Sequence, residues 1–330
     1  MKILVTGGLG FIGSNFITML LNQNKNFEIV NIDAELVGSN HDNLAKISHL
    51  SSYEFIKGNI TNRNLMENTI DNCDAVVNFA AESFVDRSIS DANPFLVSNI
   101  RGAYTILDIC TKLEKRMIQI STDEVFGSLP NETANEISKF NPSNPYAATK
   151  AAAELLVNSY IITHDSDVLI TRCTNNYGPR QFSEKLIPKT ILLAYNNKKI
   201  PIYGKGTNIR DWIHVDDHCS AVLSTLLNGK KGESYNISAN NEIDNLTIVR
   251  KILEIMGKSE DLIEFVEDRP GHDLRYSLNS TKISNDLNWS TKLSFEEGLK
   301  KTIDWYLNNE KLMNNISSIT SNPTPWKSSN

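Results

Sequence analysis

The chain has 330 residues and a formal net charge of −6, with 40% hydrophobic and 22% charged residues. This length and balance predict a globular protein with a sizeable core, in one large domain or two modest ones. An acidic chain with scattered lysine pairs does not favour nucleic acid as a partner, and no apolar run approaches the about 18 residues that span a bilayer.

The cysteines and the first residues bear on location. None of the four cysteines has a metal-type spacing, and three of them lie in apolar or helix-like runs. We therefore expect buried, reduced thiols. Met1 leads directly into a strand and a glycine turn, so no signal peptide is expected. These features predict a cytoplasmic protein without a membrane partner.

In the first half of the chain, short β-branched runs alternate with amphipathic stretches. The expected strands are residues 3–5, 29–33, 53–57, 75–80, 117–122 and 168–173. The expected helices between them are residues 12–22, 94–113 and 146–164. This alternation is typical of βαβ units, so we predict an α/β fold with a doubly wound parallel sheet.

After about residue 176, loops with Pro, Gly and Asn interrupt this alternation, and helices are expected at residues 221–227, 246–256 and 295–306. We predict a first domain of residues 1–176, to which residues 210–237 return. Residues 177–209 and 238–312 would form a second, smaller mixed α/β domain. Residues 313–330 are rich in Ser, Asn, Pro and Thr and are expected to have no role in the core.

A glycine-rich turn follows the first expected strand. Gly7, Gly10 and Gly13 open the first helix, where a tight turn and a close backbone approach both require glycine. The helix N-terminus then offers N–H groups to a pyrophosphate. Asp33 ends the second strand 20 residues after Gly13, where a carboxylate accepts from ribose hydroxyls and repels a 2′-phosphate. The pattern predicts a Rossmann-type site for NAD rather than NADP. Asn59 is either an adenine contact or a turn residue.

Tyr146 and Lys150 are four residues apart at the start of an expected helix, so they share one helical face. A nearby ammonium favours the phenolate, which predicts a lowered pKa for the tyrosine and a role as a base. An ordinary surface pair is the alternative interpretation.

Two adjacent carboxylates, Asp123 and Glu124, follow Thr122 at the end of an expected strand. The carboxyl ends of parallel strands are where open α/β sheets bind ligands. In a closed pocket the two carboxyl groups would have separated pKa values, one as proton donor and one as acceptor. Hydride transfer alone needs no such pair, whereas removal of water from a sugar needs two further proton transfers.

These segments, together with the blocks 80–88, 175–188, 210–217 and 268–273, closely resemble the dTDP-glucose 4,6-dehydratases of the extended short-chain dehydrogenase family. The resemblance runs from Met1 to about residue 309. It implies a lyase that converts a nucleotide-activated glucose into its 4-keto-6-deoxy derivative while bound NAD is regenerated. The first domain would bind NAD, and the second would bind the nucleotide sugar.

The resemblance also implies a role for each catalytic residue. Tyr146 would take the proton of the sugar 4-hydroxyl, Thr122 would hydrogen-bond that oxygen, and Lys150 would hold the nicotinamide ribose. Glu124 would remove the C5 proton, and Asp123, as an acid, would protonate the departing 6-hydroxyl.

Further contacts are implied in the same way. The residues expected to bind NAD are Gly7, Gly10, Phe11, Ile12, Gly13, Asp33, Asn59, Ile60, Ala80, Ala81, Asn99, Tyr146, Lys150 and Asn176. The residues expected to bind the nucleotide sugar are Ser83, Thr122, Asn175, Lys185, Leu186, Pro201, Tyr203, Arg210, Asn245, Arg269, His272 and Tyr276. A homodimer through the helices near 94–113 and 146–164 is implied as well.

No metal site is expected. His214, Asp216, Asp217 and His218 form a cluster in the sequence, but the aspartates precede the apolar run 219–227, where we expect them to cap a helix.

Several alternatives remain. A UDP-sugar 4-epimerase or UDP-glucuronate decarboxylase would share the glycines, Tyr146 and Lys150 but would not explain Asp123 beside Glu124. A UDP- or GDP-sugar 4,6-dehydratase would explain both carboxylates. A non-catalytic NAD-sensing protein would be expected to lose Tyr146 or Lys150. Phe84 stands where many members of the family have His, which leaves the exact sugar open.

Overall fold

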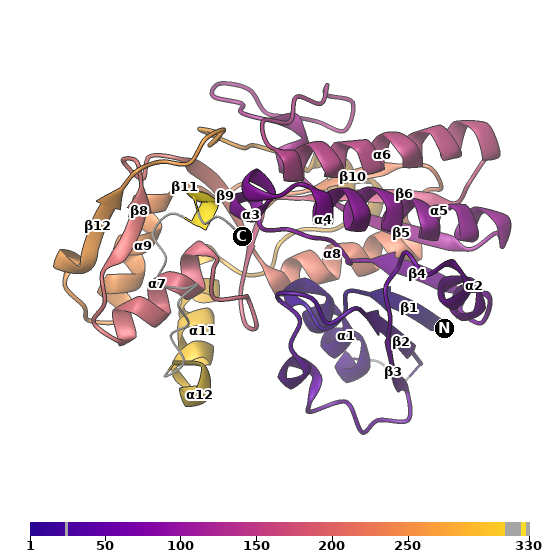
Figure 1. The fold of residues 1–330 in the computed structure, drawn as a ribbon, viewed down its shortest axis with the longest axis horizontal. Helices are drawn as coiled ribbons and strands as arrows, with labels where there is room; N and C mark the ends of the chain where they lie inside the picture. The colour runs from indigo at the N-terminus through magenta and orange to yellow at the C-terminus, as the bar shows by residue number, and fades with distance from the viewer. Residues whose placement is uncertain (24–25, 314–324, 328–330) are drawn as a thin grey trace.

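The computed structural model describes residues 1–23, 26–313 and 325–327. Seven strands form one sheet in the order β10-β6-β5-β4-β1-β2-β3 (Figure 1). Their bounds are β1 Lys2–Thr6, β2 Glu28–Asp33, β3 Tyr53–Lys57, β4 Ala75–Asn78, β5 Arg116–Thr122, β6 Val168–Cys173 and β10 Ser234–Ile237. Every neighbouring pair is parallel, which confirms the predicted doubly wound α/β sheet. The edge strand β10 comes from the segment 210–237.

Helices cover both faces of this sheet (Figure 1). Ile3 and Val5 of β1 face α1 (Phe11–Gln23) and α8 (Val215–Asn228), whereas Leu4 faces the opposite side. That side is covered by α2 (Arg63–Asp71), α5 (Ala103–Lys112) and α6 (Pro145–His164). Because side chains alternate along a strand, a continuously apolar run can bury both faces, as strands of a parallel sheet require.

Two of the expected helices differ in detail. The run 94–113 is helical but contains a π-helical segment, Leu96–Gly102, between α4 (Asn93–Phe95) and α5. Helix α8 begins at Val215 rather than at residue 221, and His214 caps it because its Nδ1 accepts from the Asp216 N–H at 3.2 Å. The aspartates therefore lie in the first turn, where their negative charges interact favourably with the helix dipole. The expectation that they cap the helix is wrong.

The second half contributes two small sheets at one end of the molecule (Figure 1). Strands β7 (Asn175–Tyr177), β9 (Ile209–His214) and β11 (Glu242–Asp244) form one sheet, and β8 (Ile200–Tyr203) pairs with β12 (Ile263–Val266). The helices of this half are α7 Leu186–Tyr195, α9 Asn245–Ile255, α10 Thr281–Leu287, α11 Phe295–Leu307 and α12 Glu310–Met313. A separate apolar cluster from α7, α9 and α11 forms their core.

The tail differs from expectation where the structure describes it. Met313 is fully buried in the cluster beneath α7 and α11, and Trp326 in the short helix η5 (Pro325–Lys327) is 8% exposed. The expectation that the tail has no role in the core is therefore wrong for these two residues. Residues 314–324 and 328–330 lie outside the described part. Among the described residues, no helix is long and apolar enough to cross a membrane.

Candidate active site

A cavity lies along the carboxyl ends of the parallel strands. Its wall contains Gly7 after β1, Asp33 at the end of β2, Thr122 at the end of β5 and Cys173 at the end of β6. All the residues expected to bind NAD line it, with the exception of Asn99. This is the place where doubly wound sheets bind dinucleotides.

The glycine turn has the shape that a pyrophosphate needs. Gly7 has a φ of +70°, and a Cβ there would lie 2.7 Å from the backbone nitrogen of Ala80. A Cβ on Gly13 would lie 2.5 Å from the Gly7 carbonyl oxygen. The turn therefore excludes side chains, which brings its backbone close to the cavity and leaves the N-terminus of α1 facing it.

Asp33 holds this turn in place as well as lining the cavity. Its Oδ2 accepts from the Leu9 N–H at 3.0 Å, and its Oδ1 accepts from the Ser39 hydroxyl at 2.7 Å. A carboxylate has lone pairs left beyond these bonds, so it can still accept from a ribose hydroxyl. The glycine cradle and this carboxylate together fit NAD.

Two expected cofactor contacts have other partners. Asn99, in the π-helical segment, is buried behind the cavity wall, where its Oδ1 accepts from the Glu82 N–H and its Nδ2 donates to the Glu82 carbonyl and the Thr149 hydroxyl. It supports the cavity loop instead of lining the cavity. Asn59 does line the cavity, but its Oδ1 accepts from the backbone and hydroxyl of Thr61, so its carbonyl serves the turn.

Helix α6 brings Tyr146 and Lys150 to the cavity. Asn144 caps the helix by accepting from the Ala147 N–H at 2.9 Å, and Pro145 occupies its first position. The Tyr146 N–H donates to the Ser88 hydroxyl at 3.2 Å, and Lys150 Nζ donates to the Ile120 carbonyl at 2.6 Å. The first bond fixes the backbone of Tyr146 and the second fixes the Lys150 side chain, and both residues line the cavity beside the end of β5.

The electrostatics of this pair differ from expectation. Burial, and then the Glu124 carboxylate, raise the pKa of Tyr146 well above its ordinary value, although a hydrogen bond with Thr122 opposes the shift. Burial also lowers the pKa of Lys150 to about 8. The expectation of a lowered tyrosine pKa is therefore wrong for the protein alone, because spacing along a helix does not reveal how deeply the phenol is buried.

The carboxyl groups of Asp123 and Glu124 lie in different environments, as a proton donor and a proton acceptor require. Asp123 is almost fully buried; its Oδ1 accepts from Thr122 Oγ1 at 3.0 Å, and its Oδ2 has no hydrogen-bond partner among the described residues. Burial, and then the neighbouring Glu124, raise the pKa of Asp123 to about 8. Glu124 is more accessible and accepts from Asn144 Nδ2 at 3.3 Å and from the Tyr276 hydroxyl at 3.4 Å.

A second cavity adjoins the first and shares part of its wall, including Phe84, Glu124 and Lys185. The residues expected to bind the nucleotide sugar that line this second cavity are Asn175, Lys185, Leu186, Pro201, Tyr203, Arg210, Asn245, Arg269, His272 and Tyr276. Ser83 and Thr122 line the first cavity. Glu124 lies on the boundary, so a substrate in one cavity and a cofactor in the other would meet at that residue.

Cationic and aromatic side chains line the second cavity together with the carboxylates of Asp86, Glu124 and Glu184. Lys185 Nζ donates to the Ser83 carbonyl at 2.9 Å, and the Arg210 guanidinium lies 4.2 Å from the centre of the Tyr276 ring. Burial, and then Arg269, lower the pKa of His272 to about 4, so this imidazole is neutral at neutral pH. Guanidinium and ammonium groups of this kind suit the oxygens of a diphosphate.

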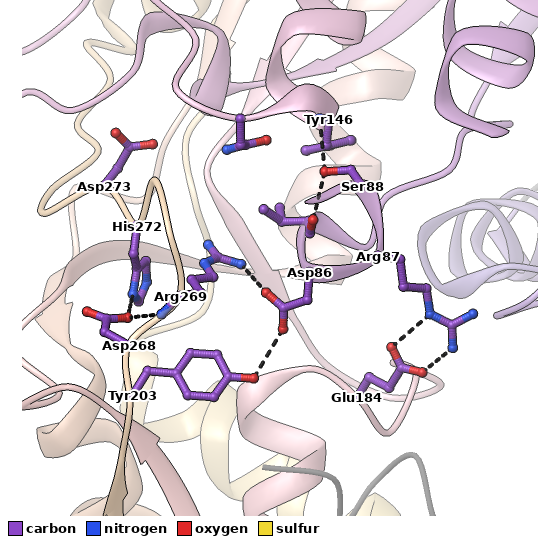
Figure 2. Close-up of polar contacts among 12 residues, drawn as sticks. Asp86, Arg87, Ser88, Tyr146, Glu184, Tyr203, Asp268, Arg269, His272 and Asp273 are labelled. Carbon is purple, nitrogen blue, oxygen red and sulfur yellow. Dashed lines mark hydrogen bonds and ion pairs between the residues drawn. The ribbon is translucent and has the colours of Figure 1, made fainter. Parts of the chain in front are cut away.

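Asp86 is one of several residues of the second cavity that the sequence did not identify as a substrate contact. Asp86, in the short helix α3 (Val85–Ser90), accepts from Arg269 Nη1 at 2.7 Å and from the Tyr203 hydroxyl at 3.1 Å (Figure 2). The sequence offered one signal, since Asp86 stands in a block that carries the family resemblance. Its partners lie more than a hundred residues away, so their contact could not be inferred from spacing.

The cluster around His214 lies at the start of α8. Asp217 accepts from the backbone N–H groups of Lys292 and Leu293 at 3.0 and 3.1 Å. Within the described residues, no group of three or more His, Cys, Asp or Glu side chains is placed to hold a metal ion.

Comparison with known proteins identifies the protein family to which the chain belongs. A family model described as GDP-mannose 4,6 dehydratase matches residues 4–302. The chain belongs to this dehydratase family. The match spans both cavities and ends before the short helix that carries Trp326.

Curated and solved members of the dehydratase family confirm the predicted resemblance. The chain is 43% identical to a dTDP-glucose 4,6-dehydratase of Streptomyces niveus, over 94% of each protein. It is 48% identical to the low-salt glycan biosynthesis protein Agl12 of Haloferax volcanii, over 94% of this chain and all of that protein. A crystal structure of dTDP-glucose 4,6-dehydratase from Bacillus anthracis in complex with NAD has a TM-score of 0.89 and 42% identity, and it covers 94% of this chain and 98% of that one.

Proposed function

We propose that this protein is an NAD-dependent dTDP-glucose 4,6-dehydratase, a lyase that removes water from the sugar and leaves a 4-keto-6-deoxy product. One observation carries the proposal: Asp123 and Glu124 line the same cavity as Tyr146 and Lys150. A hydride-transfer enzyme such as a 4-epimerase has no use for two additional proton-transfer groups there.

The first step is oxidation at C4. The glycine turn, Asp33 and Lys150 would hold NAD, which would supply the acceptor and later the donor of the hydride and a positive charge that favours the Tyr146 phenolate. Tyr146 accepts the proton of the 4-hydroxyl, and Thr122 orients that oxygen. Burial of the phenol keeps competing water away from the transferred proton.

The second step eliminates water. The new 4-keto group acidifies the C5–H bond, and Glu124 takes that proton. The C6–O bond breaks while Asp123, in its acid form, donates a proton to the departing hydroxyl. Glu124 then returns its proton to C5 as C6 is reduced, and solvent carries the proton on Tyr146 back to Asp123. The raised pKa of Asp123 keeps this carboxyl group in the acid form that the donation to the departing hydroxyl requires.

The elevated pKa of Asp123 gives a pH prediction. Since the acid form is needed and its pKa is about 8, kcat/KM should fall as the pH rises through about 8. Asp123→Asn should lower kcat by about 10²–10⁴-fold and remove this decline from the residual activity. Lys150 titrates in the same range, so a decline that persists unchanged in Asp123→Asn would assign it to Lys150 and contradict the prediction.

A panel of substrates tests the proposed activity. dTDP-, UDP-, GDP- and CDP-glucose, with GDP-mannose because of the family model, are incubated separately with the protein, and 4-keto-6-deoxy products are measured. We expect the highest kcat/KM with dTDP-glucose. A higher value with a UDP- or GDP-sugar would change the nucleotide but keep the dehydratase, whereas an epimer formed without loss of water would contradict the dehydratase itself.

The residues that line each cavity indicate which segments of the chain bind which ligand. We assign NAD to residues 1–176 together with 210–237, and the nucleotide sugar to residues 177–209 and 238–312. The first cavity is lined largely by the former segments, and the second includes α7, β8 and the loop after β12. The four cysteines are free and buried, which suits the reducing cytoplasm as the location.

A homodimer is part of the same proposal. The outer helices of one sheet face carry exposed apolar side chains: Leu96 is 49% exposed, Tyr104 40%, Leu155 60% and Ile162 83%. Such side chains gathered on two neighbouring helices favour a symmetric protein interface. Leu155→Arg is expected to convert the dimer into a monomer, measured by sedimentation or light scattering. A wild-type protein that is monomeric at micromolar concentration would contradict this.

A further inference from the structure

Asp86 links two of the nucleotide-facing side chains to each other. Its carboxylate accepts from both the Arg269 guanidinium and the Tyr203 hydroxyl, which come from separate segments (Figure 2). The hydrogen bond from Arg269 is charge-assisted and therefore strong. Arg269 Nε is buried and has no partner among the described residues, so it can donate to a phosphate oxygen. Asp86 thus fixes Arg269 while leaving part of its guanidinium free for a ligand.

Trp326 contacts Tyr203 from outside the cavity, and its short helix lies against the segments that carry Asp86 and Arg269. Its ring meets Tyr203 edge-on, with the ring centres 4.9 Å apart and an interplanar angle of 87°. The Ser90 hydroxyl, at the end of α3, donates to the Trp326 carbonyl at 3.1 Å. Lys327 pairs with Glu267 at 2.6 Å, two residues before Arg269. The short helix η5 therefore contacts all three segments that carry Asp86, Tyr203 and Arg269.

The strengths of these contacts differ. The Lys327–Glu267 pair is largely exposed, with 52% and 65% of the side chains accessible, so it contributes little. The buried Trp326 ring contributes most, because an edge-on aromatic pair adds to the burial of apolar area. Trp326 itself does not line either cavity, so it acts through Tyr203.

We propose that Asp86, in the wall of the second cavity, and Trp326, behind that wall, are positioning residues, here called the outer layer, that hold Tyr203 and Arg269 ready for the nucleoside diphosphate half of the substrate. Side chains that are fixed before binding lose less conformational freedom when the ligand arrives, which strengthens binding without changing the chemistry. Trp326 lies beyond residues 4–302, so the family match does not account for it. The inference rests on the proposed function, since it concerns the substrate of that same site.

Binding and turnover together test the outer layer. dTDP is titrated calorimetrically into the NAD-loaded full-length protein, and KM and kcat for dTDP-glucose are measured in parallel. Asp86→Asn is expected to raise both the Kd of dTDP and the KM by about ten-fold, with kcat changed by less than about two-fold. Trp326→Ala should raise both by about three-fold or more, whereas Trp326→Phe keeps the edge-on contact and should stay within about two-fold of wild type.

Asp167→Asn is the matched control. Asp167 is another partly buried carboxylate that pairs with an arginine, Arg116 at 3.0 Å. This pair lies at the amino ends of β5 and β6, away from the cavities at their carboxyl ends. This control should leave the Kd of dTDP unchanged. Thermal unfolding shows whether each variant folds. If Asp86→Asn does not fold, the two Trp326 variants alone test whether the outer layer strengthens the binding of dTDP.

The outcomes separate the two proposals. Unchanged Kd of dTDP in folded Asp86→Asn and Trp326→Ala would overturn the outer layer and leave the dehydratase in place. Loss of kcat without a change in Kd would also overturn it, because the residues would then act on the chemistry. A wild-type protein that neither binds dTDP nor converts dTDP-glucose would overturn both.

Discussion

Replacing Tyr146 by Phe is expected to lower the turnover of dTDP-glucose by about 10²–10⁴-fold, because the first proton transfer loses its acceptor. The ring would remain packed against Phe95, so the fold and the binding of NAD should be preserved. The measurement is kcat with dTDP-glucose, together with calorimetric titration of NAD. Tyr146→Phe should leave the Kd of NAD within about two-fold of the wild-type value, whereas a general loss of stability would raise it.

Tyr235→Phe provides the matched control. Tyr235 is a fully buried tyrosine of β10 that lines neither cavity, and it also loses only a hydroxyl. Its kcat should equal that of wild type. A Tyr146→Phe protein that turns over as fast as this control would remove Tyr146 from the mechanism.

Replacing Glu124 by Gln should stop the reaction one step later. Glutamine keeps the size of the side chain and can still accept from Asn144 and Tyr276, but it cannot take the C5 proton. We expect product formation to fall by about 10²–10⁴-fold, while oxidation at C4 still proceeds in part. A single-turnover experiment would then show the absorbance of reduced cofactor rising without release of the 4-keto-6-deoxy sugar.

Solvent deuterium gives an independent measure of the same residue. In heavy water, the wild-type product should carry deuterium at C5, because the carboxylate that takes this proton can exchange it before returning one. Tyr276→Phe removes the hydroxyl that donates to Glu124 and should slow the reaction less than Glu124→Gln does. Normal elimination by Glu124→Gln would assign the C5 proton to another base.

Much of this site could be predicted from local patterns. The glycine turn, Asp33, the end of β5 and the start of α6 each lie within a few consecutive residues, and βαβ alternation brings them to one edge of the sheet. The two adjacent carboxyl groups indicated one proton donor and one acceptor, and the family resemblance implied that Asp123 is the donor. The high pKa of Asp123 agrees with that assignment.

The sequence could not predict how deeply a side chain is buried, or which residues far apart in the chain come into contact. The raised pKa of Tyr146 arises from burial, which the spacing to Lys150 does not encode. Asn99 supports the loop at Glu82 instead of lining the cavity, because the π-helical segment buries it behind the wall. Trp326 is a single aromatic residue in a polar tail, so composition averaged over that tail conceals its contact with Tyr203.

In the proposed mechanism, one protein oxidises C4, eliminates water and reduces C6 of the same sugar. The test uses dTDP-glucose deuterated at C4, mixed with undeuterated dTDP-glucose that carries ¹³C throughout the sugar. We expect a 4-keto-6-deoxy product with deuterium at C6, confined to molecules without ¹³C. Deuterium in free NADH, deuterium crossing to the ¹³C sugar, or an epimer that retains its 6-hydroxyl would contradict it.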